Sequence, residues 1–405
     1  MSGSPAKSEG PSSSDKARTH LAASACDSVL TAAFRVDASL NIGSGHIMRC
    51  LTLADVLKNA GVVCTFICRD HPGNLFELIR NRGHGLLTLP RSIVEIAAAN
   101  YAERPMSEHE SWLGCGWEVD ASQTRELLQR AVFDWLVVDH YALDSRWELF
   151  LASNCKGIMA IDDLADRPHH CDVLLDQTLG RKTADYGSLL PKNAKVLVGS
   201  LYAMLRPEFS ALRAESLRRR EEPRLDRILI SMGGVDKENV AAEVLRALRD
   251  CRLPKSCGIT VVLGAHAAGI DVVLSEAQSM RCPTDVKANV GDMAELMAAS
   301  DLAIGASGST SWERCCLGLP SVTVVLGENQ RYAALALQDA GASINIERST
   351  DFRDKLITAI RHFSLDQSRL STMSKRARLV TDGLGAERVK KMLFSISGVS
   401  TTDIR

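Results

Sequence analysis

The residues whose types and spacing most clearly indicate chemistry form a glycine turn that ends in a histidine, Ile42-Gly43-Ser44-Gly45-His46. The preceding residues 33–37 read as a buried strand, and residues 47–57 carry apolar side chains at helical spacing. Such a strand-to-helix turn exposes unpaired N–H groups and the positive helix end, which together favour an anion. A histidine there is disfavoured as a cation, so we expect it to stay neutral and able to accept a proton. These residues indicate chemistry on a phosphorylated substrate.

This turn alone does not decide the function. A histidine at a helix start can equally well hydrogen-bond to a carbonyl, and Gly-x-Gly-His also occurs outside enzymes. The turn lacks the third glycine of a dinucleotide-binding fingerprint and the lysine of a P-loop.

The second informative motif is the small-residue loop Gly305-Ala306-Ser307-Gly308-Ser309-Thr310-Ser311, followed by Glu313. Small residues let the backbone approach a phosphate, and hydroxyl groups supply further donors. Glu313, one turn further on, has the reach to accept both hydroxyls of a ribose. A capped helix start, in which Ser and Thr only satisfy backbone N–H groups, is the alternative. Asn329 and Gln330 follow a further strand, an order that resembles the nucleotide-binding half of two-domain GT-B glycosyltransferases.

These motifs require a scaffold that alternates strands and helices. Runs that are apolar on both faces belong to parallel sheets covered by helices, so the chain is predicted to be α/β with two Rossmann-like domains. Ligands of such sheets bind at the carboxyl ends of the strands, which places the site in the cleft between the domains. The strands are predicted at residues 33–37, 63–68, 135–139, 157–162, 173–176, 195–198, 227–232, 259–263, 302–304 and 321–325.

Polar residues follow several of these strands. They include Asp139-His140-Tyr141, Asp162-Asp163 and, around the turn Met232-Gly233-Gly234, Ser231 and Asp236. We expect the side chains that do chemistry to come from these strand ends.

The domain boundaries follow from changes in composition. Residues 1–30 are rich in Ser, Ala, Gly and Lys and are predicted to be a disordered extension. A charged block with a proline at residues 215–224 is interpreted as the link between an N-terminal domain, 31–215, and a C-terminal domain, 216–395. Residues 366–395 read as helical except around 382–385, and 396–405 as a flexible tail.

Composition narrows the function classes. A formal net charge of -1 creates no global field for nucleic acid or an anionic membrane. The twelve cysteines form no C-x-x-C pair and are interpreted as buried free thiols of a cytoplasmic protein. His169-His170-Cys171-Asp172 is the best candidate for a metal site, but neighbouring residues of a strand face opposite sides, so no metal is expected.

Taken together and in order, the motifs resemble the PseG family of UDP-2,4-diacetamido-2,4,6-trideoxy-β-L-altropyranose hydrolases. The likeness runs from about Phe34 to Val389. The residues that carry it are Arg35-Val36-Asp37, Gly43 to Ala54 with Arg49, Asp139-His140-Tyr141, Asp162-Asp163, Cys171-Asp172, Ser231 to Gly234, and Gly305 to Glu313.

The resemblance implies a GT-B-like enzyme of pseudaminic acid biosynthesis that cleaves a UDP-sugar with water, with inversion and without metal or cofactor. It implies that His46 is the base and Tyr141 its companion. Binding of the substrate and its UDP is expected from Gly43, Gly45, Arg49, Gly233, Gly234, Ser307, Gly308, Ser309, Thr310, Glu313, Asn329 and Gln330.

Two other functions stay open. One is a glycosyltransferase that moves a UDP-linked sugar to an acceptor, and the other is a non-catalytic nucleotide-sugar binder that would not need His46. The expected partner is a small UDP-sugar, with no nucleic acid or membrane, and the chain is expected to be a monomer.

Overall fold

The computed structural model describes residues 29–91, 109–129, 131–251, 253–264, 267 and 269–398. The expected N-terminal extension lies outside these residues except for positions 29 and 30, and so does the expected tail from residue 399 onward.

The first sheet has seven parallel strands in the order β3-β2-β1-β4-β5-β6-β7. The chain starts in the middle of the sheet, builds one side and then crosses back to build the other. The strands are β1 (Thr31–Val36), β2 (Val63–Arg69), β3 (Gly85–Leu89), β4 (Phe133–Asp139), β5 (Cys155–Ile161), β6 (Val173–Asp176) and β7 (Lys195–Val198).

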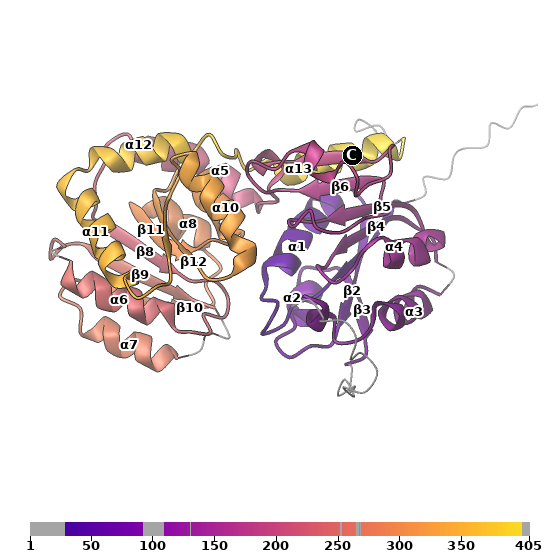
Figure 1. Ribbon diagram of the computed structural model, residues 1–405, viewed down its shortest axis with the longest axis horizontal. Coiled ribbons are helices and arrows are strands. Elements are labelled where there is room, and N and C mark those ends of the chain that lie inside the picture. Colours follow the sequence, from indigo (N-terminus) through magenta and orange to yellow (C-terminus); the bar gives the residue numbers. More distant parts are fainter. Residues whose placement is uncertain are drawn as a thin grey trace, which may run out of the picture.

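The second sheet repeats this design with six parallel strands in the order β10-β9-β8-β11-β12-β13. Figure 1 shows the two sheets in separate lobes, each covered by helices. Two α/β domains with parallel sheets were predicted, and the structure confirms this architecture. The strands are β8 (Arg227–Ser231), β9 (Gly258–Leu263), β10 (Thr284–Ala288), β11 (Leu302–Ala306), β12 (Ser321–Val325) and β13 (Ile344–Glu347).

The helices cover both faces of each sheet, as parallel strands require. The first four, all in the N-terminal lobe, are α1 (Gly45–Asn59), α2 (Phe76–Asn81), α3 (Trp117–Leu128) and α4 (Ser145–Leu151). The remaining helices are α5 (Pro207–Arg219), α6 (Val240–Asp250), α7 (Ile270–Gln278), α8 (Met293–Ala299), α9 (Thr310–Cys316), α10 (Glu328–Asp339), α11 (Phe352–Leu365), α12 (Ser368–Ala377) and α13 (Gly385–Ile396).

Each sheet has one point where the order of strands reverses, and this point decides where the loops lie. It falls between β1 and β4 in the first sheet and between β8 and β11 in the second. The loops after such neighbouring strands lead to opposite faces and leave a crevice at the carboxyl edge. Four of the loops that the sequence singled out follow these four strands.

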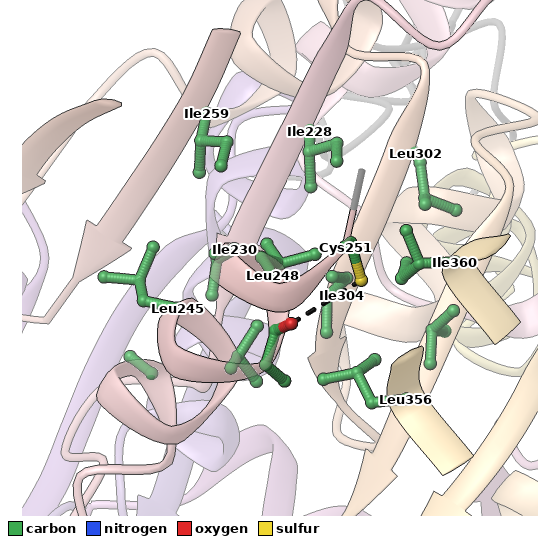
Figure 2. Packing of buried hydrophobic residues seen from close by; sticks show 14 of the residues in the cluster. Ile228, Ile230, Leu245, Leu248, Cys251, Ile259, Leu302, Ile304, Leu356 and Ile360 are labelled. Atoms are coloured by element: carbon green, nitrogen blue, oxygen red, sulfur yellow. Dashed lines mark hydrogen bonds between the residues drawn. The ribbon is translucent and has the colours of Figure 1, made fainter. Parts of the chain in front are cut away.

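One face of the second sheet packs against helices through a large apolar core. Figure 2 shows the strands β8, β9 and β11 meeting helices α6 and α11 mainly through isoleucine and leucine side chains. The labelled residues are Ile228, Ile230, Leu245, Leu248, Cys251, Ile259, Leu302, Ile304, Leu356 and Ile360.

The chain passes between the lobes twice, and these passages correct the expected domain boundaries. The charged block was expected to be the link, but α5 already packs on α8 and α9 of the C-terminal lobe, so the first passage precedes Pro207. The second passage follows α12, and α13 then packs against α1 in the N-terminal lobe. Figure 1 shows α13, in yellow, on the lobe that carries the indigo strands. The apolar face of α13 thus becomes part of the N-terminal core, although α13 is far from the rest of that core in the sequence.

Candidate active site

A cleft of about 450 Å³ lies between the two domains at the carboxyl ends of both sheets. Its N-terminal wall comes from the turn before α1, from the loop after β4 and from the ends of β5 and β6. Its C-terminal wall comes from the loops after β8, β11 and β12. The cleft is therefore lined from both domains at the switch points of both sheets.

His46 enters this cleft from the first turn of α1. The preceding turn is closed by the N–H of Gly43, which donates to the carbonyl of Ser39 at 2.8 Å. Gly43 has a φ of +79°, a conformation that favours glycine. The His46 Nδ1 lies 2.7 Å from Oδ1 of Asp139, the last residue of β4. Strand β4 thereby fixes the orientation of the imidazole.

A carboxylate and arginine network surrounds this contact. Arg49, one turn after His46, donates to both carboxylate oxygens of Asp139 at 2.6 and 2.7 Å. It also donates to Asp163 at 2.5 Å. Burial by itself would raise the pKa of Asp139, but Arg49 and His46 hold it well below its usual range. Asp139 is therefore an ionised acceptor for the Nδ1–H of His46.

Tyr141 completes the N-terminal wall. Its ring meets the His46 ring edge to face, with 4.7 Å between centroids, and its hydroxyl donates to Asp163 at 2.9 Å. Burial and the neighbouring Asp163 raise the pKa of Tyr141 well above its usual value, so the phenol stays protonated. The ring of Trp112 stacks on Tyr141 at 5.8 Å. These contacts hold the phenol rigidly beside the imidazole.

Glycines and small side chains form the part of the C-terminal wall nearest the first domain. Gly233 has a φ of +91°, and a side chain on Gly264 would overlap the carbonyl of Gly234. A Cβ on Gly234 would lie 3.1 Å from Oγ of Ser44, so the two walls approach closely here. Lys237 joins them by donating to Asn41 at 2.9 Å. These loops line the cleft with glycines and with the hydroxyl side chains of Ser309 and Thr310, an arrangement suited to phosphate.

The structure brings together most of the residues predicted from the sequence. The cleft is lined by His46, Tyr141, Gly43, Gly45, Arg49, Gly233, Gly234, Ser307, Gly308, Ser309, Thr310, Asn329 and Gln330. Gln330 also closes the loop after β12, because its Oε1 accepts from the N–H of Leu326 at 3.2 Å.

Glu313 is not part of this lining. It lies one turn inside α9, and its carboxylate faces Arg206 at 3.7 Å, at the start of α5. Burial raises the pKa of Glu313 to about 7, with Arg206 opposing the shift. The side chain therefore faces the passage between the lobes in this structure.

Sequence reasoning did not assign several residues of the cleft to the site. Asp163, Gln177 and Thr178 follow β5 and β6 directly, so the polar residues after these strands were the available signal. Asp162 was indistinguishable from Asp163 in the sequence, but Asp162 turns away to bind Tyr186 at 2.9 Å. Burial and the charge of Asp163 raise the pKa of Asp176, the last residue of β6, to about 6.

The described residues contain no group of three or more His, Cys, Asp or Glu side chains arranged to hold a metal ion. His169 of the best sequence candidate instead contacts Glu148 at 2.7 Å. The eleven cysteines within the described ranges are all free. Among the described helices, none has both the length and the apolar character that a bilayer span requires.

Comparison with known proteins identifies the scaffold. Residues 272–390 match the glycosyltransferase family 28 C-terminal domain. The chain is similar to MurG of Acinetobacter baumannii, with a TM-score of 0.62 and 16% identity over 90% of this chain and 99% of that one. The chain has the GT-B fold. LpCGTa in complex with UDP gives a TM-score of 0.60 at 13% identity, over 90% of this GT-B chain and 98% of that one.

A curated relative aligns with the GT-B chain at higher identity. The UDP-2,4-diacetamido-2,4,6-trideoxy-β-L-altropyranose hydrolase of Campylobacter jejuni is 28% identical over 217 residues, which are 53% of this chain and 64% of the relative. Alignments with four curated relatives span 47–64% of the relatives' lengths.

Proposed function

We propose that this protein hydrolyses a UDP-linked sugar in the interdomain cleft, with His46 as the general base. The observation that carries the proposal is the 2.7 Å contact between His46 Nδ1 and the buried carboxylate of Asp139. This contact places an oriented imidazole opposite a wall of glycine and hydroxyl residues. A base on one wall and a phosphate cradle on the other suit displacement of a diphosphate by water.

The tautomer of His46 follows from its partner. Asp139 accepts the Nδ1–H, so in the neutral ring the lone pair is on Nε2. Nε2 takes a proton from water as the water oxygen bonds to the anomeric carbon. The bond from that carbon to the phosphate oxygen breaks, and its electron pair leaves with UDP. A single displacement inverts the anomeric centre, and general base catalysis contributes about 10²–10⁴ in rate.

The leaving group needs charge stabilisation rather than a strong acid. Backbone and hydroxyl donors of the loops after β8 and β11 line the cleft at Gly233, Gly234, Ser309 and Thr310. Donors fixed in advance around a developing anion contribute about 3–4 kcal/mol each. UDP therefore departs as the dianion or trianion without a proton from the protein.

The substrate class is proposed from the relative in Campylobacter jejuni, whose name specifies a UDP-linked 2,4-diacetamido-2,4,6-trideoxy sugar. We extend this sugar class, and a place in pseudaminic acid biosynthesis in the cytoplasm, to the present chain. Asp163, Gln177 and Thr178 lie on the same wall as His46 and offer the polar contacts for the sugar.

A glycosyltransferase is the second candidate, because the family 28 C-terminal domain supports sugar transfer on the same scaffold. In that case His46 would deprotonate a hydroxyl of an acceptor in place of water. The two candidates differ in one simple observation: a hydrolase releases UDP from the donor with no acceptor present.

The test is a reaction of the purified protein with the UDP-diacetamido sugar in oxygen-18 water, followed by NMR and mass spectrometry. We expect oxygen-18 on the anomeric carbon of the free, inverted sugar and none in UDP. Oxygen-18 in UDP would mean attack at phosphorus. UDP release only after an acceptor is added would establish the transferase.

His46→Ala tests the base directly. We expect turnover to fall at least a hundredfold while the dissociation constant of UDP stays within threefold. His170→Ala, in the same domain but outside the cleft, is the matched control and should remain active. Full activity of His46→Ala would exclude His46 as the base. A wild-type protein that binds UDP but does not turn over the sugar nucleotide would favour the non-catalytic binder.

A further inference from the structure

A buried arginine lies directly behind the small-residue loop of the C-terminal wall. Arg314, on α9, is only 2% exposed. Its Nη2 donates to the carbonyl of Ala306 at 2.9 Å and to Oγ of Ser311 at 2.9 Å. Its Nη1 donates to Oγ1 of Thr310 at 3.3 Å. A Cβ at Gly305 would lie 2.6 Å from Nη1, so glycine at that position makes room for the guanidinium.

Carboxylates neutralise Arg49, the other buried arginine of the site, but they do not neutralise Arg314. Arg49 contacts two carboxylates, whereas none of the described carboxylates lies within 4.0 Å of Arg314. The acidic neighbour that acts on Arg314 electrostatically is Glu313, whose own pKa is raised to about 7. Burial lowers the pKa of Arg314 to about 10, so it is charged at neutral pH. Its Nε is buried and has no hydrogen-bond partner among the described residues.

A buried charge without a counterion is unfavourable, so this arrangement calls for an anion nearby. The loop that Arg314 holds also lines the cleft: Ala306 and Thr310 are both at its surface. A hydroxyl that accepts a hydrogen bond keeps its own hydrogen for another acceptor. Because Oγ1 of Thr310 accepts from Arg314, its hydrogen is available to an acceptor in the cleft.

We propose that Arg314 is a positioning residue for the diphosphate of the nucleotide, acting from behind the loop through Ala306 and Thr310. Its charge compensates the charge of the diphosphate without contacting it, and its hydrogen bonds fix the backbone and direct the Thr310 hydroxyl. This inference rests on the proposed function only for the identity of the ligand as a uridine diphosphate.

The test compares uridine, UMP, UDP and inorganic pyrophosphate by isothermal titration calorimetry. Arg314→Gln removes the charge, and Arg314→Lys retains it. We expect Arg314→Gln to weaken UDP and pyrophosphate at least tenfold while uridine stays within twofold. Arg314→Lys should recover most of the affinity for UDP. A merely structural role would not change the ratio between UDP and uridine.

Arg220 supplies the matched control, because it is also buried, hydrogen-bonds to carbonyl oxygens and lies in the same lobe outside the cleft. Arg220→Gln should lower thermal stability and leave the ratio of UDP to uridine affinity unchanged. Thr310→Val removes the directed hydroxyl alone and should weaken UDP severalfold relative to uridine. If Arg314→Gln does not fold, the effect of Thr310→Val on the ratio of UDP to uridine affinity tests the proposal by itself.

The outcomes separate this inference from the proposed function. A wild-type protein that binds UDP no better than uridine would remove the phosphate site and with it the proposed function. A wild-type preference for UDP that Arg314→Gln and Thr310→Val leave intact would overturn the role of Arg314 alone. Equal losses for uridine and UDP in Arg314→Gln would also overturn it.

Discussion

Asp139→Asn is the substitution that most directly tests the arrangement around His46. Asp139 is 1% exposed and receives His46 Nδ1 at 2.7 Å and two hydrogen bonds from Arg49. Asparagine has nearly the same shape but only one acceptor oxygen, so Arg49 and His46 compete for it. If Arg49 takes the oxygen, the amide NH2 faces Nδ1 and forces the lone pair of the imidazole onto Nδ1. Nε2 then carries a hydrogen and cannot accept a proton.

The expected magnitudes follow from these contacts. A base held in the wrong tautomer lowers kcat by about 10³–10⁴. Removing one partner of a buried ion pair costs about 3–5 kcal/mol, and we expect the lower end because Arg49 keeps Asp163 at 2.5 Å. The affinity for UDP should change less than threefold, because the opposite wall of the cleft is not altered.

The assay is release of UDP from the sugar nucleotide, measured together with urea unfolding and calorimetric binding of UDP. Asp120→Asn is the matched control: Asp120 is also buried and binds Arg35 and Arg69, but it does not line the cleft. It should lose comparable stability and keep its kcat. A folded Asp139→Asn protein with kcat within threefold of wild type would refute the role given to Asp139.

Three further predictions test other parts of the molecule. Tyr141→Phe removes the hydroxyl on Asp163 but keeps the ring beside His46, so kcat should fall about 10–100-fold; an unchanged kcat would show that only the ring matters. Because burial raises the pKa of Glu313 from 4.5 to about 7, stability should fall as pH rises between these values. Because the side chain is 16% exposed, we expect this fall in the free energy of unfolding to be about 1–3 kcal/mol, and Glu313→Gln should remove it. Urea-unfolding free energies of wild type and variant that change in parallel with pH would contradict this. Leu393→Ala, in the face of α13 that packs on α1, should destabilise the protein by about 2–5 kcal/mol, whereas the 85% exposed Leu365→Ala should not; equal unfolding midpoints would count against this packing.

The central strands could be predicted from the sequence because both of their faces are buried. Each of the ten predicted strands is present, with ends within two residues of the prediction. The three strands that were not predicted, β3, β10 and β13, all lie at the edges of the sheets. Edge strands are covered on fewer sides, and β10, with the sequence Thr284–Ala288, is at least partly exposed throughout. They therefore lack the continuous apolar run that marks a buried strand.

In the site, too, some features could be predicted from the sequence and others could not. Glycines and strand-end residues such as His46 and Tyr141 were predictable, because the fold dictates that the carboxyl ends of neighbouring strands meet. The partner of His46 could be named as a motif residue, but its contact spans 93 residues and depends on the exact direction of both side chains. The position of Glu313 was not predictable either, because its side chain faces Arg206, which lies in the first passage of the chain between the lobes.

Helix α13 has a consequence for how the protein is made. The helix that carries His46 packs on residues such as Val389 and Leu393, which a ribosome adds about 340 residues later. Until they are added, the apolar back of α1 has no cover, although the second lobe can already be complete. A nascent chain released before residue 385 would expose this surface and be a target for chaperones and proteases. Complete packing of the helix that carries His46 thus waits until residues 385–394 have been synthesised.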